Sequence, residues 1–300
     1  MEAVEREVAQ LFPDAFVCRL PTHDRVGKYG RRELHNADLV IAGGTNLLFS
    51  HWRKQRQWKM TWRDIAAIRG KLVLMGTGWT TYQSPPDWLA RSAYRCILSA
   101  TMSHSVRDAY SLRHLATAGF KSVLNTGCPT FWTLGGLEHR SAGSGRRVVT
   151  TLTDYRKDPE LDRQMLNGLL KHYDEVKIWI QGKHDLTYFK MLEVEGISIV
   201  RPSLSAFDEV LEHDDIDFVG TRLHAGIRAL QKRRAALILS VDNRAREMGK
   251  DFGLPVLERT AMDALADRLT CPQRFAITLP TAAIDQWRSQ FTPLSGRQRI

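Results

Sequence analysis

Residues 217–230 read DFVGTRLHAGIRAL, and this stretch decides the fold. Its first four residues form a short apolar run that ends at a glycine, as a buried strand does. Apolar residues then recur at Leu223, Ile227 and Leu230, with the spacing of a helix that packs one side on a sheet. A strand followed at once by a helix is part of a β-α-β unit, so we expect parallel strands covered by helices.

Thr221, Arg222 and His224 lie where this predicted strand ends and the helix begins. Thr221 is a predicted N-cap, which places Arg222 and His224 in the first turn, where unpaired amides and the helix dipole favour an anion. Arginine adds a planar fork of donors, and histidine can exchange a proton near neutral pH. A lone histidine is more often structural, but this pairing favours function. We therefore predict Arg222 and His224 as catalytic residues and Thr221 as a binding residue.

The same alternation of short apolar runs and helical segments extends over most of the chain. It predicts an α/β protein with two Rossmann-like domains facing a cleft, because a glycine- and serine-rich stretch at 134–147 divides the pattern. Strands are expected at 15–20, 38–44, 71–78, 96–101 and 122–127, and then at 147–153, 176–182, 197–202, 217–220, 235–241 and 255–258. The predicted domains are 1–138 and 146–270, with a tail at 271–300 that packs back on the first domain.

Composition restricts the class of protein. The 300 residues suit two domains of about 150 residues each. The chain has 43 lysines and arginines against 33 acidic residues, and its formal net charge of +10 favours anionic partners. It contains no long apolar run and no signal peptide, so we expect a cytoplasmic protein. The four cysteines form no CxxC pair, and we expect no metal site.

Gly43, Gly44, Thr45 and Asn46 follow another predicted strand. Glycines at this position let the backbone approach a ligand, and a following helix N-terminus offers free amides. The glycines do not form a GxGxxG fingerprint, and a tight turn is the plain alternative. We predict these four residues as substrate-binding.

Arg107 follows the strand expected at 96–101, with Ser105 or Asp108 as a cap for the next helix. We predict that Arg107 binds substrate, and the alternative is a surface arginine beside a cap. His104 and His114 are expected to support the fold and not the chemistry.

The segment 51–63, HWRKQRQWKMTWR, mixes basic and aromatic residues. Such a mixture can contact nucleic acid or an anionic membrane. Trp58 and Trp62 are four residues apart, as on the buried side of a helix, and this argues against base stacking. We expect no nucleic acid partner and predict peripheral contact of this segment with an anionic membrane.

Five pieces of the chain resemble the polysaccharide pyruvyl transferase family, in family order: 37–48, 105–120, 125–132, 152–162 and 219–230. The Arg-x-His piece VGTRLHAGIRAL is the most specific of them. The resemblance implies a glycosyltransferase-B-like fold and transfer of a pyruvyl group from phosphoenolpyruvate to sugar hydroxyls, with release of phosphate and without a cofactor. The acceptor would be a bacterial exopolysaccharide or wall-glycan precursor, including lipid-linked forms.

The resemblance also implies roles for the predicted residues. Arg222 and Arg107 would hold the anionic donor, and His224 would act as general acid and base. Family members usually begin with a strand and a glycine-containing loop before the first helix, whereas this sequence opens in a helical pattern at 2–12, so the first domain is expected to lack its first strand. A nucleotide-sugar glycosyltransferase of the same fold is the alternative, because it too would place Arg and His beside a phosphate.

Overall fold

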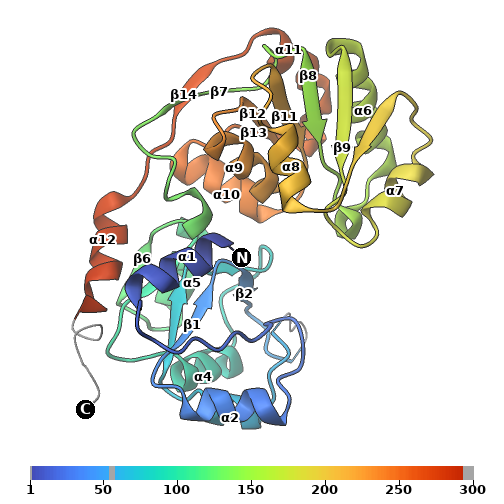
Figure 1. Ribbon diagram of the computed structural model, residues 1–300. Coiled ribbons are helices and arrows are strands. Elements are labelled where there is room, and N and C mark those ends of the chain that lie inside the picture. Colours follow the sequence, from blue (N-terminus) through green and yellow to red (C-terminus); the bar gives the residue numbers. More distant parts are fainter. Residues whose placement is uncertain (1, 54–57, 293–300) are drawn as a thin grey trace. The chain divides into compact units, whose positions relative to one another are not determined.

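The structure, a computed structural model, describes residues 2–53 and 58–292 (Figure 1). It divides into two compact units, Met1–Trp132 with Leu279–Ile300, and Thr133–Thr278. Parallel strands alternate with helices in both, so the predicted α/β class with parallel strands is confirmed.

The second unit is built on a six-stranded parallel sheet in the order β10-β9-β8-β11-β12-β13. Numbered along the chain, this is the order 3-2-1-4-5-6 of the Rossmann fold, and it reverses between β8 and β11. The strands and their connecting helices are β8 (Arg147–Thr150), α6 (Pro159–His172), β9 (Glu175–Trp179), α7 (Asp185–Met191), β10 (Ile197–Val200), α8 (Leu204–Val210), β11 (Ile216–Gly220), α9 (Leu223–Gln231), β12 (Ala236–Ser240), α10 (Asn243–Phe252) and β13 (Val256–Glu258).

Helix α9 packs closely on β11 and β12, as its apolar spacing predicts. Leu223, Ile227 and Leu230 are all buried. Gly226 allows the approach, because a Cβ atom there would lie 2.4 Å from Ile238. The strand and helix predicted from 217–230 are therefore confirmed, and the start of α9 is fixed against the sheet.

The segment 134–147, expected to be a linker, is attached to the second unit. Its strand β7 (Glu138–Arg140) pairs with β14 (Arg274–Ala276). The buried carboxylate of Asp217 accepts hydrogen bonds from the amides of Gly143 at 2.6 Å and Gly145 at 3.1 Å. The glycines and serines of this segment therefore form tight turns and amide contacts, and the segment is not a flexible linker. The unit ends with a 3₁₀ turn (Arg259–Ala264), α11 (Leu265–Thr270) and β14.

Among its described residues, the first unit contains three parallel strand pairs: β1 (Val40–Gly43) with β3 (Leu72–Met75), β2 (Asn46–Leu48) with β4 (Gly78–Trp79), and β5 (His104–Val106) with β6 (Val123–Asn125). Isolated bridges join Leu72 to Leu98 and Thr77 to Val106. Its helices are α1 (Glu2–Leu11), α2 (Lys28–Asn36), α3 (Trp62–Ala67), α4 (Trp88–Ile97), α5 (Ala109–Thr117) and α12 (Thr281–Ser289).

Two strands predicted in this unit are wrong. Residues 15–20 form a loop that pairs with no strand in the described chain, and Phe16 is 90% exposed. Cys96 and Ile97 instead complete α4, whose residues Ala93 and Ile97 are buried at helical spacing. A short apolar run alone does not separate a strand from the end of an amphipathic helix.

The C-terminal helix α12 packs within the first unit. Its Trp287 is fully buried, and Arg288 binds both carboxylate oxygens of Glu7 in α1, at 2.6 and 2.7 Å. Gln290 accepts a hydrogen bond from the Ser103 amide at 2.8 Å. Residues 279–292 therefore belong with the first unit, whereas β14 belongs with the second. No helix in the described part of the chain is long and apolar enough to span a bilayer.

Candidate functional site

The predicted Arg-x-His pair lies at the point where the strand order of the second unit reverses. In open parallel sheets, ligands bind beyond the carboxyl ends of the strands at this switch point. Here the chain leaving β8 supplies residues 151–155, and the chain leaving β11 supplies residues 221–224. The two segments are joined directly, because the Thr221 amide donates to the carbonyl of Thr151 at 3.1 Å.

Arg222 is the N-cap residue of α9, and its side chain turns back over the carboxyl end of β8. Its Nε donates to the carbonyl of Leu152 at 2.8 Å. Its Nη2 donates to Asp185 at 2.6 Å and to Asp154 at 3.1 Å. Most of the donor fork predicted to bind an anion is thus used by the protein itself. Nη1 makes no hydrogen bond with any described residue.

Asp185 fixes the position of Arg222. Its carboxylate is buried and accepts hydrogen bonds from the amides of Gly182 at 2.6 Å, Gln181 at 3.2 Å and Asp154 at 3.2 Å. Asp185 is the first residue of α7, whose N-cap is His184. A buried carboxylate with this many donors holds the arginine in one orientation.

Thr221 is not the N-cap of α9, so that prediction is wrong. Its hydroxyl donates to the carbonyl of Thr151 at 3.1 Å and contacts the hydroxyl of Thr153 at 2.9 Å. Cap preference alone favoured Thr221, but its hydroxyl instead contacts residues of the segment that follows β8. Thr221 therefore fastens the two segments of the site together.

His224 is the second residue of α9 and is partly exposed. It lies in the first helical turn, two residues from Arg222, as the sequence indicates. It is not among the buried residues that form the core of the unit.

Tyr155 and Arg244 also belong to this site and were not singled out from the sequence. The Tyr155 ring is 5.1 Å from the guanidinium carbon of Arg222 and 6.0 Å from that of Arg244. Arg244 donates to the Tyr155 hydroxyl at 2.5 Å and to Asp242 at 2.5 Å. Burial works against the charge of Arg244, but the hydrogen bonds and charge of Asp242 raise the pKa of its guanidinium. Tyr155 follows β8 and Arg244 follows β12. A search of the residues beyond the carboxyl ends of the predicted strands, which identified Arg222, could therefore have identified both.

Arg107, predicted to bind substrate, lies in the first unit and is 2% exposed. It donates to the Asp108 carboxylate at 3.1 Å and to the side chain of Asn46, another predicted binding residue. Asp108 caps α5 as expected, whereas Ser105 lies inside β5. The alternative of a surface arginine is wrong, since Arg107 fills a space where a Cβ on Gly78 would lie 2.2 Å from its guanidinium.

Gly43 is the last residue of β1, and Gly44 and Thr45 follow the strand. Gly44 has φ of +59°, which favours glycine. Cβ atoms on Gly43 and Gly44 would lie 2.4 and 2.9 Å from Val4 of α1. The close approach that the double glycine permits is thus made by α1. The carbonyl of Thr45 accepts a hydrogen bond from the Gly78 amide at 2.9 Å, at the start of the β2–β4 pair.

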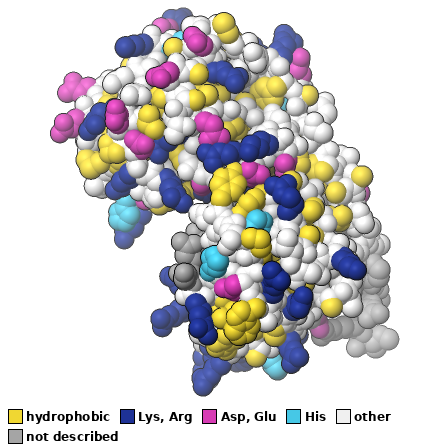
Figure 2. Space-filling view, turned by 180° about the vertical axis from the view of Figure 1, so that it is seen from behind, with side chains coloured by type: hydrophobic (Ala, Val, Ile, Leu, Met, Phe, Trp, Pro, Cys, Tyr) yellow, Lys and Arg dark blue, Asp and Glu magenta, His cyan; other side chains and the backbone are white. Residues whose placement is uncertain are grey.

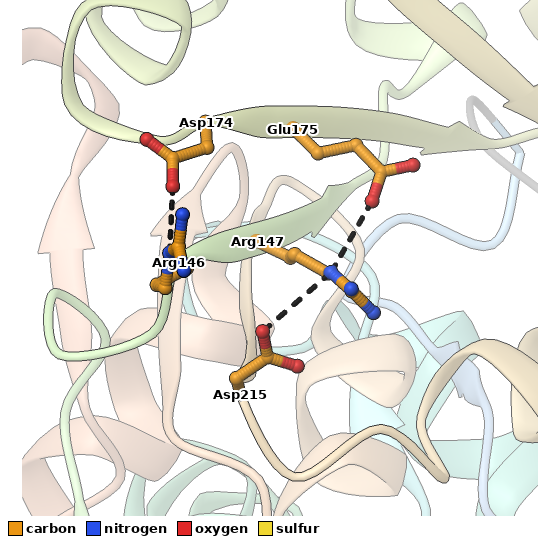
Figure 3. Close-up of a pocket in the computed structure, with 5 residues that line it drawn as sticks. All are labelled: Arg146, Arg147, Asp174, Glu175 and Asp215. Carbon is orange, nitrogen blue, oxygen red and sulfur yellow. Dashed lines mark hydrogen bonds and ion pairs between the residues drawn. The ribbon is translucent and has the colours of Figure 1, made fainter.

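A pocket of about 270 Å³ lies at the opposite, amino-terminal edge of the second unit's sheet (Figure 3). Its charges are paired: Arg146 with Asp174 at 2.8 Å, and Arg147 with Glu175 and Asp215 at 3.4 and 3.5 Å. Such exposed ion pairs contribute little to stability. Because both arginines are paired with carboxylates, neither is left as an unbalanced cation for a substrate anion. We therefore assign no chemistry to this pocket.

The fold and the switch-point site together define an α/β protein with a polar, partly cationic site at the carboxyl edge of a Rossmann sheet. A family model described as polysaccharide pyruvyl transferase matches residues 1–243. The chain belongs to the polysaccharide pyruvyl transferase family and is a transferase. The search of curated proteins gives no match. Among solved structures, the S. aureus MnaA-UDP co-structure is similar with a TM-score of 0.50 and 12% sequence identity, over 88% of this chain and 76% of that one. This likeness concerns the fold alone.

Proposed function

We propose that this protein transfers the pyruvyl group of phosphoenolpyruvate to two hydroxyls of a sugar and releases inorganic phosphate. The observation that carries the proposal is the position of Arg222 and His224 at the switch point of the sheet, in a chain that belongs to this family. We further propose the finer architecture, two Rossmann-like domains facing a cleft in a glycosyltransferase-B-like fold.

The chemistry requires one proton to reach the methylene carbon of phosphoenolpyruvate, which makes the central carbon electrophilic. Two sugar hydroxyls then form C–O bonds to that carbon, and its bond to the phosphate oxygen breaks. One hydroxyl proton balances the proton given to carbon, and the other leaves with phosphate. His224 would give and take these protons, because a positioned imidazole can serve both steps.

Arg222 would bind the donor through Nη1, while Asp185, Asp154 and Leu152 hold the rest of its guanidinium. The two carboxylates offset its charge, so the anion needs further donors. The first-turn amides of α9 and the Arg244 guanidinium, which also lies near the Tyr155 ring, are candidates for this role. This arrangement orients the donor and stabilises the departing phosphate.

The proposed acceptor is a bacterial exopolysaccharide or wall-glycan precursor. A lipid-linked precursor would place the enzyme at the cytoplasmic side of an anionic membrane, and the high net charge supports this. The alternative is a nucleotide-sugar glycosyltransferase. The solved neighbour is a complex with UDP, but at 12% identity that observation carries only the fold.

The proposal is tested by incubating the full chain with phosphoenolpyruvate and a glycan-lipid fraction. We expect phosphate release that depends on the fraction, and a glycan product that yields pyruvate after mild acid. Sugar transfer from a nucleotide sugar without pyruvate incorporation would support the alternative and contradict the proposal.

A further inference from the structure

A shallow groove of about 460 Å³ between α2 and α3 of the first unit is lined mainly by basic side chains. They are Lys28, Arg31, Arg32 and His35 of α2 and Arg63 of α3, with alanines of α3 beside them. None of these residues belongs to the site at the end of β11.

The chain around the groove has a strong excess of positive charge. Segments 25–35 and 59–71 contain eight lysines and arginines and only two acidic residues. The two acids are engaged: Asp64 is buried and binds Arg31 at 2.8 Å, and Glu33 pairs with Arg32 at 3.3 Å. Lys28 and Arg63 form no ion pair with any described residue. On the side of the first unit seen in Figure 2, lysine and arginine side chains outnumber acidic ones.

Two exposed aromatic side chains belong to the same helices: Tyr29 on α2 is 61% exposed and Trp62 on α3 is 60% exposed. The prediction that Trp58 and Trp62 share a buried helical side is wrong, because α3 begins at Trp62. Trp52 and Trp58 are buried. Residues 54–57 of the segment predicted to contact a membrane lie outside the described residues.

Exposed Trp and Tyr beside lysines and arginines are typical of surfaces that rest in the headgroup region of a bilayer. The charges attract anionic lipid, and the aromatic rings enter the boundary between headgroups and acyl chains. A nucleic acid fits less well, because stacking needs a row of aromatic platforms along a groove. We propose that the α2–α3 surface, with Lys28, Arg63, Tyr29 and Trp62 at its contact, docks the protein on an anionic phospholipid bilayer.

This inference goes beyond the proposed reaction and is tested without it, by sedimentation of the full chain with vesicles. We expect binding to vesicles of phosphatidylglycerol mixed with phosphatidylcholine and little binding to pure phosphatidylcholine. Each basic residue near such a surface contributes about fivefold in affinity, so Lys28→Glu with Arg63→Glu should weaken partitioning by at least tenfold. Trp62→Ala should weaken it further without changing the net charge.

The matched control is Lys171→Glu with Lys190→Glu, which reverses two exposed charges of the second unit and changes the net charge equally. We expect this control to bind the vesicles nearly as the unchanged protein does. Equal loss in both double variants would overturn the proposal, because it would show attraction by net charge alone. Undiminished vesicle binding by the α2–α3 variant, or preferential binding of the unchanged protein to a DNA duplex, would also overturn it.

Discussion

At the scale of residues, Arg222 has two tasks that compete for one side chain. The sequence predicted an arginine at a helix N-terminus, and the structure adds that Leu152, Asp154 and Asp185 already bind it. Their contacts with Arg222 could not be predicted, because they lie in the segments that follow β8 and β9 and come near the start of α9 only through the strand order. Arg222 is therefore a support of the fold as well as a candidate ligand of the donor.

Arg222→Lys tests this double role. The ammonium of lysine is a point charge without the planar fork that reaches Leu152 through Nε and Asp154 and Asp185 through Nη2, so the contact with the buried Asp185 would weaken. We expect the free energy of unfolding to fall by about 1–3 kcal/mol and phosphoenolpyruvate to bind more weakly. The measurements are denaturant unfolding and calorimetric titration.

Arg228→Lys is the control for that change. Arg228 is on the same helix and binds Asp208 through two nitrogens, at 2.8 and 2.6 Å, but both side chains are more exposed. We expect a smaller loss of stability and unchanged donor binding. Equal effects of the two substitutions on donor binding would remove Arg222 from the site.

His224→Ala should lower pyruvyl transfer by about a hundredfold or more, because a positioned proton donor is lost. Folding and donor binding should stay near normal, since His224 is partly exposed. His213→Ala is the control, because His213 is an exposed histidine near the opposite end of β11. Near-normal turnover by His224→Ala would refute its role as acid and base.

At the scale of elements, periodicity predicted β11, α9 and most of the second sheet, because its strands are continuous apolar runs with clear stops. It did worse in the first unit, where strands of two to four residues carry little pattern. β5 is an example: Ser105 was expected as a possible cap but lies in the strand, where its hydroxyl accepts from the Gly76 amide at 2.8 Å. Such contacts between strand ends depend on tertiary structure and leave no local signal.

His104 in β5 makes the first unit sensitive to acid. It is buried, the Leu74 amide donates to its Nδ1, and its Nε2 lies 3.0 Å from the carbonyl of Ser99, as in a neutral ring. Burial lowers the pKa of His104 to about 4, against about 6.5 when unfolded. Between these values the unfolded state binds the extra proton, so this contribution to stability is full above pH 6.5 and falls as the pH drops toward 4.

The expected loss across that pH range is on the order of 3 kcal/mol. His104→Gln should remove this part of the pH dependence, whereas His213→Gln should leave it unchanged. Unfolding by urea at several pH values between 7.5 and 4.5 provides the measurement. An unchanged slope of stability against pH in His104→Gln would contradict the assignment.

At the scale of the whole molecule, the chain returns to its first unit after completing the second. The sequence predicted a tail that packs back, and α12 is placed in the first unit by Trp287, Arg288 and Gln290. The exact ranges of the domains stay a prediction, since the glycine-rich stretch that marked the boundary is pinned to the second unit by Asp217. The amphipathic pattern of a helix predicts that the helix packs on a core, but it does not predict which core.

Trp287→Ala tests this assignment. Removing a fully buried tryptophan should cost about 3–5 kcal/mol in the unit that contains it. We expect hydrogen exchange to speed up in α1, β6 and neighbouring strands of the first unit, with the amides of β8 and β11 still protected. Faster exchange mainly in the second unit would contradict the placement of α12.

The most direct test of the central claim is thermal stabilisation of the full chain by phosphoenolpyruvate, compared with UDP, UDP-sugars and DNA at equal concentration. A ligand that binds only the folded state raises the midpoint of unfolding in proportion to its affinity. The proposed function predicts that phosphoenolpyruvate raises the midpoint, that Arg222→Lys reduces the shift, and that UDP and UDP-sugars give little. Stabilisation by UDP or a UDP-sugar, with none by phosphoenolpyruvate, would contradict it.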